Sequence, residues 1–301
     1  TVWAAQARLL LEREAEPQVT PADQELLYAR WLPLLAQDPA YNPNLSLQRA
    51  GGFALADNAL SWRPLQSWKP LPVVLAHPAD RFGCGHYRVI QPFMALQQAG
   101  CIEGLLSDGL PPVIELQRYA PDTVILQRQI GDERLDAMRR MQRFSSAFKV
   151  YELDDYLPNL PMKSAYRQAM PKDVLKSLRR GLGYVDRLVV STPALAEALA
   201  GLHEDIRVLG NRLPVPWWAD VRPGQRRASR KPRVGWAGGA GHTGDLDMIA
   251  GVVRELADEV EWVFMGMCPD SLRPYIHEFR PGVAIEQYPT ALAGLNIDLA
   301  L

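Results

Sequence analysis

From Pro70 to the end of the chain, short apolar runs alternate with amphipathic stretches, and this alternation constrains the fold more than any other feature. Such runs are typical of strands buried on both faces of a parallel sheet, and the stretches between them have the spacing of covering helices. The pattern predicts an α/β protein built from βαβ units. The predicted strands are 72–77, 122–127, 147–153, 186–191, 206–210, 232–237, 260–266, 282–287 and 297–301, and the predicted helices are 87–99, 132–144, 172–185, 193–202, 246–257 and 271–279.

A proline-rich and basic stretch, 214–233, separates the strands into two sets. It lacks periodicity and is typical of an interdomain connection. The first 69 residues differ, with helical patterns at 4–15 and after Thr20-Pro21 and a proline-punctuated loop at 38–47. The predicted domains are a helical appendage (1–69), a first Rossmann-like domain (70–218), a linker (219–231) and a second Rossmann-like domain (232–301). Because no covering helix follows strand 297–301, we expect the second domain to be incomplete and the chain to be a fragment.

Composition excludes several classes of function. The 301 residues are 48% hydrophobic and 22% charged, and the formal net charge of −1 provides no general attraction to nucleic acid or anionic membranes. No apolar run approaches the length of a membrane span, and the N-terminus lacks the apolar core of a signal peptide. Cys84, Cys101 and Cys268 fit neither a paired metal spacing nor a disulfide framework. We expect a cytoplasmic protein with no nucleic-acid partner and no integral membrane segment.

A glycine-rich turn lies between strand 232–237 and the helix predicted after it. Three of its four glycines fit the spacing G-x-G-x-x-G; the four are Gly238, Gly239, Gly241 and Gly244. Such a turn offers backbone amides and a helix N-terminus to a phosphate, although glycine turns that bind nothing are also common. A dinucleotide site would need an acidic residue about 20 residues later, at the end of the next strand. That strand ends in GMCP (266–269) without a carboxylate, which argues against hydride transfer.

Polar residues follow two strands of the first set. Gly83, Gly85, His86, Tyr87 and Arg88 form a donor-rich loop after strand 72–77. A lone histidine is usually structural, but we interpret this grouping at a sheet edge as a ligand contact.

Glu152, Asp154 and Asp155 end strand 147–153. These carboxylates could bind sugar hydroxyls, act as a base or hold a metal. The alternative is that Asp154 or Asp155 caps the next turn.

Together these stretches resemble the GT-B glycosyltransferases, most closely the branch related to glycosyltransferase family 4 in bacterial surface-polysaccharide biosynthesis. The resemblance covers roughly residues 72 to 301, in the order of the family. The matching stretches are GCGHYRVIQPFMAL, DTVILQRQ, VYELDDYLP, RLVVSTPALAEAL, VLGNRLP, PRVGWAGGAGHTGDL and WVFMG.

The resemblance implies two Rossmann-like domains that face each other across a cleft, with the nucleotide-sugar donor on the second. The implied donor-binding residues are Gly238, Gly239, Gly241, His242, Thr243 and Gly266. The implied acceptor-side or cleft residues are Gly83, Gly85, Arg88, Glu152 and Asn211, the last at the crossing between domains. His86, Asp154 and Asp155 are the catalytic candidates. His242 and Thr243 stand where many relatives have a basic residue, and the family's acidic donor-binding segment would follow residue 301.

The implied activity is transfer of a sugar, with retention, from a nucleotide-diphosphate sugar to a glycan, lipid-linked or protein acceptor. The sugar nucleotide is a co-substrate, and we expect no metal and no cofactor. The implied location is the cytoplasm, with peripheral contact at the inner face of the membrane. The alternatives are a non-catalytic GT-B-like module of a larger protein and a nucleotide-binding oxidoreductase.

Overall fold

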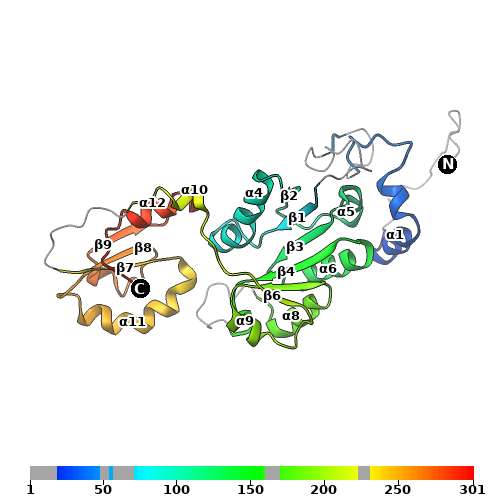
Figure 1. Cartoon of the computed structure of the whole chain (residues 1–301). Coiled ribbons are helices and arrows are strands. Elements are labelled where there is room, and N and C mark those ends of the chain that lie inside the picture. Colours follow the sequence, from blue (N-terminus) through cyan, green and yellow to red (C-terminus); the bar gives the residue numbers. More distant parts are fainter. Residues whose placement is uncertain (1–18, 48–53, 57–70, 160–169, 223–230) are drawn as a thin grey trace, which may run out of the picture.

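Two separate parallel sheets form the framework of the protein. The structure is a computed structural model that describes residues 19–47, 54–56, 71–159, 170–222 and 231–301. One sheet has six strands in the order β2-β1-β3-β4-β5-β6, and the other has four in the order β10-β7-β8-β9 (Figure 1). Every pairing between these strands is parallel. The predicted α/β class with two parallel sheets is confirmed.

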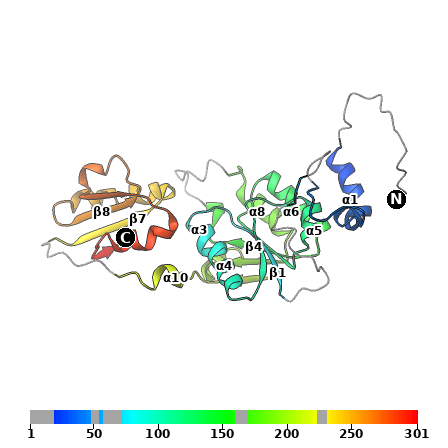
Figure 2. The ribbon, with the colours of Figure 1, turned by 90° about the horizontal axis from the view of Figure 1, so that it is seen from above.

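The strands follow the apolar runs closely. Their bounds are β1 Val73–His77, β2 Glu103–Leu106, β3 Thr123–Gln127, β4 Phe148–Leu153, β5 Arg187–Val190, β6 Ile206–Val208, β7 Arg233–Gly238, β8 Glu261–Gly266, β9 Glu278–Pro281 and β10 Leu299–Ala300. Figure 2 shows the two sheets at different ends of the molecule, joined through the short helix α10 (Val215–Trp218).

Helices cover both faces of the first sheet. On one face, β-strand side chains such as Leu75, Leu126 and Tyr151 pack in one buried core with α5 (Val113–Tyr119), α6 (Asp132–Phe144), α8 (Val174–Leu182) and α9 (Pro193–Ala198). On the other face, Val74 and Ala76 pack with Val89 and Phe93, which belong to the π-helix η1 (His86–Ile90) and to α4 (Gln91–Gln98). Since β1 is buried on both faces, its first four residues are all apolar rather than alternating with polar ones.

The second sheet is covered in the same way. Helix α11 (Thr243–Glu255) contributes Leu246 and Val253 to a core with Trp236 and Trp262 on one face. Leu292 of α12 (Tyr288–Ala293) packs on the other face. The four 3₁₀ turns described are η2 Leu157–Asn159, η3 Ala240–His242, η4 Arg273–Tyr275 and η5 Ile285–Gln287.

Helix α1 (Pro21–Ala36) packs on the first sheet's helical layer. Thr20 caps it, with its hydroxyl accepting from the Asp23 amide at 3.2 Å in a capping box. Glu25 contacts the guanidinium groups of Arg139, Arg140 and Arg143 on α6. The predicted helix after Thr20-Pro21 is confirmed, whereas the helical pattern at 4–15 and most of the linker at 219–231 lie outside the described residues.

Two predicted elements near the C-terminus are wrong. Residues 282–287 were expected to form a strand, but they form a loop and the turn η5; the strand is β9, at 278–281. Residues 271–279 were expected to form a helix, but only the η4 turn is helical there. Strand β9 forms at 278–281 because it pairs with β8 and because Glu278 forms an ion pair with buried Arg233 at 2.6 Å. Both are long-range contacts, which local periodicity does not encode.

Several described elements were not predicted, among them one strand and two short helices. Strand β2 is a half-buried edge strand, and its sequence EGLL contains a glycine that weakens any strand pattern. A Cβ on Gly104 would lie 1.9 Å from the Val74 carbonyl oxygen, so close strand packing explains that glycine. Helices α5 and α12 are too short for helical periodicity to reveal them.

Gly266 supports the end of β8, and we predict that Gly266→Ala destabilises the second sheet. Its φ is +95°, and a Cβ would lie 2.2 Å from the Gly238 carbonyl oxygen. We expect a loss of about 3 kcal/mol in the free energy of unfolding, measured by urea denaturation. Gly251→Ala is the matched control, because Gly251 lies within α11 and a Cβ there meets nothing within 4 Å; it should be neutral or slightly stabilising. Equal effects would contradict this account.

Candidate functional site

The strand orders place two loops at topological switch points. In the first sheet the chain goes from β1 to β2 on one side and then to β3 on the other, so the ends of β1 and β3 flank the reversal. In the second sheet β8 and β10 lie on opposite sides of β7. Parallel sheets bind ligands in the crevice that forms outside the strand ends at such points. The loops that follow β1 and β7 are therefore where a ligand is expected.

The loop after β1 is held by Asp80. Its Oδ1 accepts from the Phe82 amide at 2.9 Å and from the Gly85 amide at 3.1 Å. Gly85 is required here, because a Cβ would lie 1.8 Å from the Asp80 carbonyl oxygen, whereas a Cβ on Gly83 would meet nothing within 4 Å. Gln127 at the end of β3 joins the same loop by accepting from the Ala79 amide at 2.9 Å.

The π-helix η1 then places Arg88 inside the protein. Its Nε donates to Glu152 Oε1 at 2.6 Å, and both side chains are about 96% buried or more, with exposures of 3% and 4%. Its Nη1 donates to the Leu209 carbonyl and, at 2.9 Å, to Asn211 Oδ1. The structure thus brings three sequence-predicted residues, Arg88, Glu152 and Asn211, into one hydrogen-bonded network, in which Arg88 and Glu152 are buried and Asn211 is exposed.

Burial controls the charge of Glu152. Loss of water raises its pKa to about 7, while Arg88 opposes this shift. Because burial has the larger effect, the Glu152 carboxyl is protonated in part of the molecules near neutral pH. Glu152 is accordingly part of an internal network rather than a free carboxylate.

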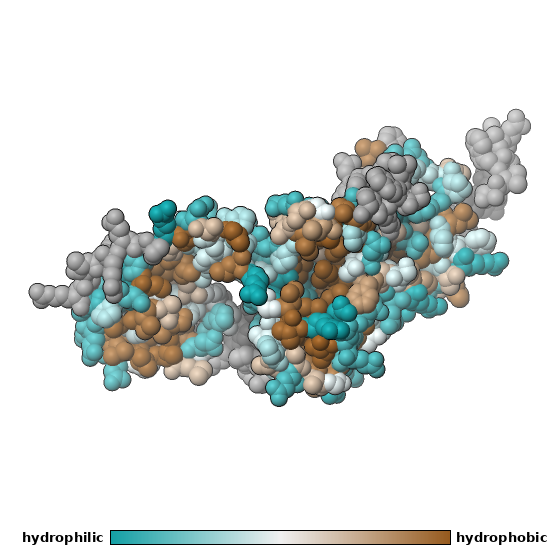
Figure 3. Space-filling model, viewed as in Figure 1, coloured by the Kyte–Doolittle hydropathy of each residue, from teal (hydrophilic) through white to brown (hydrophobic). Residues whose placement is uncertain are grey.

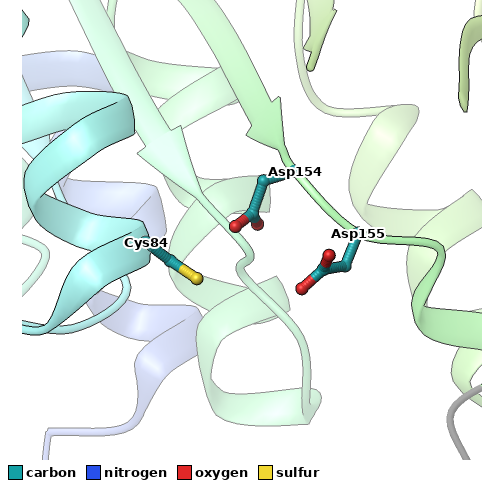
Figure 4. A group of neighbouring side chains, drawn as sticks. All are labelled: Cys84, Asp154 and Asp155. Atoms are coloured by element: carbon teal, nitrogen blue, oxygen red, sulfur yellow. The ribbon is translucent and has the colours of Figure 1, made fainter. Parts of the chain in front are cut away.

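The aspartates after β4 form a second cluster with a cysteine. Ligand atoms of Cys84, Asp154 and Asp155 all lie within 4.8 Å of one another, and Figure 4 shows the three side chains converging. Arg128 stands beside them, with its Nη2 on Asp80 Oδ2 at 2.5 Å and its Nε 3.6 Å from Asp154 Oδ1. Partial burial, followed by the Asp154 charge, raises the pKa of Asp155.

This cluster could supply three metal ligands, a thiolate and two carboxylates, but its charges are already partly balanced. The Arg128 guanidinium lies where a cation would be attracted. The expectation that the protein uses no metal stays a prediction.

Sequence reasoning missed Asp80, Cys84, Gln127 and Arg128. Position in the sequence could have indicated Gln127 and Arg128. Gln127 is the last residue of a predicted strand and Arg128 follows it, so both lie at the same end of the sheet as Asp154. Arg128 also has a positive φ of 47°, which the sequence does not reveal.

His86 lies apart from the aspartates in its contacts. Its side chain is buried, its ring centroid is 5.5 Å from that of Trp217, and its Nδ1 lies 3.3 Å from Gln91 Nε2. Burial lowers the pKa of His86. Within the described chain no hydrogen bond or ring contact joins His86 to Asp154 or Asp155, so the three catalytic candidates are not assembled by direct contact.

The loop after β7 is a tight connection to a helix. Strand β7 ends at Gly238, η3 follows, and α11 begins at Thr243. A Cβ on Gly238 would lie 2.7 Å from the Trp236 ring, whereas a Cβ on Gly239 would meet nothing within 4 Å. His242 is exposed, and its Nδ1 lies 2.9 Å from Asp245 Oδ2. Gly241 belongs to η3 with His242.

Asp155, which follows β4, also responds to a charge from the second sheet. The charge of His242, in the loop after β7, lowers the pKa of Asp155 and opposes the larger effects of burial and Asp154.

Neither a protein-family model nor a curated protein matches this sequence. Two solved glycosyltransferases resemble the structure. The first, an alpha-glucosyltransferase in complex with UDP, is 8% identical, with a TM-score of 0.46, over 76% of this chain and 72% of the other. The second, the lipopolysaccharide outer core galactosyltransferase WaaB in its apo form, is 12% identical, with a TM-score of 0.38, over 77% of this chain and 67% of the other. Similarity at this level assigns neither a family nor a reaction.

Among the described helices, none combines the length and the apolar character that a membrane span requires.

We predict that Glu152→Gln changes how stability depends on pH. A carboxyl whose pKa is raised in the folded state stabilises the fold at low pH, and this contribution is lost as pH rises through about 7. Wild type should therefore lose stability between about pH 4.5 and 7, by an amount on the order of 3 kcal/mol at most, whereas the glutamine variant should not. Chemical denaturation at several pH values measures this. An identical pH dependence of stability in wild type and variant between about pH 4.5 and 7 would contradict the prediction.

We also predict that Cys84 resists alkylation. Burial, followed by the charge of Asp154, raises the pKa of its thiol to about 12, so roughly one molecule in ten thousand carries the thiolate at pH 8. Exposed Cys101 is the internal control. Peptide mass spectrometry after brief iodoacetamide treatment should find Cys101 modified and Cys84 intact, and Asp154→Asn should increase modification of Cys84. Equal modification of both thiols in wild type would refute the prediction.

Proposed function

We propose that the protein is a GT-B-like glycosyltransferase that transfers a sugar from a nucleotide-diphosphate sugar to an acceptor. One observation carries this proposal: the aspartates follow β4 and the glycine loop follows β7, so both lie at the carboxyl ends of parallel strands, one set in each sheet. A reaction between two bound substrates needs a binding surface for each substrate, and both surfaces have to face the place where the reaction occurs. The resemblance of the sequence to GT-B enzymes agrees with this arrangement.

The glycine loop is proposed to hold the donor diphosphate. The departing nucleotide diphosphate gains negative charge, and backbone amides at the N-terminus of α11 can stabilise it. Room beside Gly239 lets the backbone approach a phosphate closely. The Asp245 carboxylate, with Oδ2 2.9 Å from His242 Nδ1, adds negative charge to this loop. Gly238, Gly241, Thr243 and Gly266 complete the proposed donor side.

The opposite edge is proposed to bind and activate the acceptor. Asp155 is exposed and has a raised pKa, which brings it closer to the range in which a carboxylate accepts a proton from a hydroxyl. Arg128 holds Asp154 and Asp80 and so fixes the edge on which Asp155 lies. Retention of configuration, a hexose donor, the absence of a cofactor and a cytoplasmic location at the membrane are proposed from the sequence resemblance alone.

Nucleotide binding tests the donor side directly. UDP, GDP and ADP and their sugars are titrated by calorimetry into wild type, Gly239→Glu and Gly251→Glu. Both glycines have open space around a Cβ, so both variants should fold. The Gly239 variant places a carboxylate beside the diphosphate and should weaken binding at least tenfold, whereas the Gly251 variant should bind like wild type.

A wild type that binds none of these nucleotides would contradict the proposal and favour a non-catalytic module. Equal binding by both variants would move the nucleotide away from the glycine loop. Release of free sugar from the bound donor, followed by chromatography, then distinguishes an enzyme from a nucleotide-binding module.

A further inference from the structure

A pocket of about 640 Å³ lies beside the segment that crosses between the two sheets. One wall comes from η1 and α4, the other from the crossing segment 209–217, and Glu286 of η5 stands at its edge. A cavity of this size accommodates a small molecule. It is separate from the glycine loop and the Cys84 cluster, none of whose residues line it.

The walls of this pocket are largely apolar. Met94, Leu209, Leu213 and Val215 all line it, and each is between 39% and 71% exposed. Trp217 adds an aromatic face, which the His86 ring partly covers. Figure 3 shows apolar side chains gathered on both units of the molecule, the one built around the six-stranded sheet and the one built around the four-stranded sheet. Large apolar side chains that stay exposed around one hollow are typical of a binding site.

The polar groups of the pocket favour an anion. Arg88 lines it with a buried side chain, and its Nη2 has no hydrogen-bond partner. A buried donor without a partner is costly, and a bound acceptor atom would satisfy it. Arg212 is exposed at the pocket and forms no ion pair with any described residue. Two guanidinium groups thus oppose one carboxylate at the edge, Glu286, while Glu152 lies behind Arg88.

We propose that this pocket binds an amphipathic anion, with an aliphatic chain against Met94 and Val215 and the anionic group at Arg88 and Arg212. The chemistry is shared by alkyl phosphates and alkyl carboxylates. Binding here goes beyond sugar transfer and does not depend on it. Since the pocket joins helix α4 to the crossing segment, its ligand would also bridge the connection between the sheets.

Decyl phosphate is the probe, with decanoate, decanol and decylammonium as comparisons, each below its micelle concentration. Binding is followed by tryptophan fluorescence, with Trp217→Phe identifying the signal from the pocket. Met94→Glu puts a charge inside the apolar wall. Leu96→Glu is the matched control, because Leu96 is a similarly exposed side chain on the same helix that does not line the pocket.

Decyl phosphate should bind wild type and Leu96→Glu alike, should not bind Met94→Glu, and should bind Arg212→Ala at least tenfold more weakly. Decanol and decylammonium should bind at least tenfold more weakly than the anions, and the ratio of phosphate to carboxylate affinity identifies the preferred head group. Absence of anion binding, equal effects of the Met94 and Leu96 variants, or equal binding of decanol would overturn the proposal. Nucleotide binding by Met94→Glu, measured separately, distinguishes failure here from failure of the transferase proposal.

Discussion

The arrangement of this protein depends on the ion pair and the hydrogen bonds that the buried guanidinium of Arg88 forms. A charge removed from water is tolerated only when it is paired and hydrogen-bonded. Arg88 obtains its partners from the end of β4, through Glu152, and from the crossing segment, through the Leu209 carbonyl and Asn211. These bonds connect the π-helix η1, the end of β4 and the crossing segment, and they hold the three in place relative to one another.

The crossing segment extends this constraint to the second sheet. The two tryptophans of α10 face different partners: the Trp217 ring lies 5.5 Å from His86, and the Trp218 ring lies 6.5 Å from Tyr288 of α12. Within the second unit, buried Arg233 joins β7 to Glu261 of β8 and Glu278 of β9. Ionic contacts therefore hold each unit together, whereas aromatic contacts join them.

Two sites of different chemistry share the loop after β1. Cys84 contributes to the polar cluster with Asp154 and Asp155, whereas His86 and Arg88, on the next turn, line the apolar pocket. Cys84 and His86 can lie this close together in the chain because Gly85 stands between them. Any side chain at position 85 would collide with the Asp80 carbonyl. A π-helix, which η1 forms, is frequent at functional sites because its extra residue per turn redirects neighbouring side chains. The loop can thus serve both the acceptor edge and the pocket.

The α/β class, eight of the ten described strands and the positions of both glycine loops could be predicted from the amino-acid sequence, because strands buried on two faces are mostly apolar and tight turns favour glycine. Three features became visible only in the folded protein: Glu152, Arg88 and Asn211 form one network, Cys84 joins Asp154 and Asp155, and β9 begins at Glu278. Each of these depends on pairing between residues far apart in the chain. Local periodicity carries no information about which distant side chain will supply the opposite charge or the hydrogen bond.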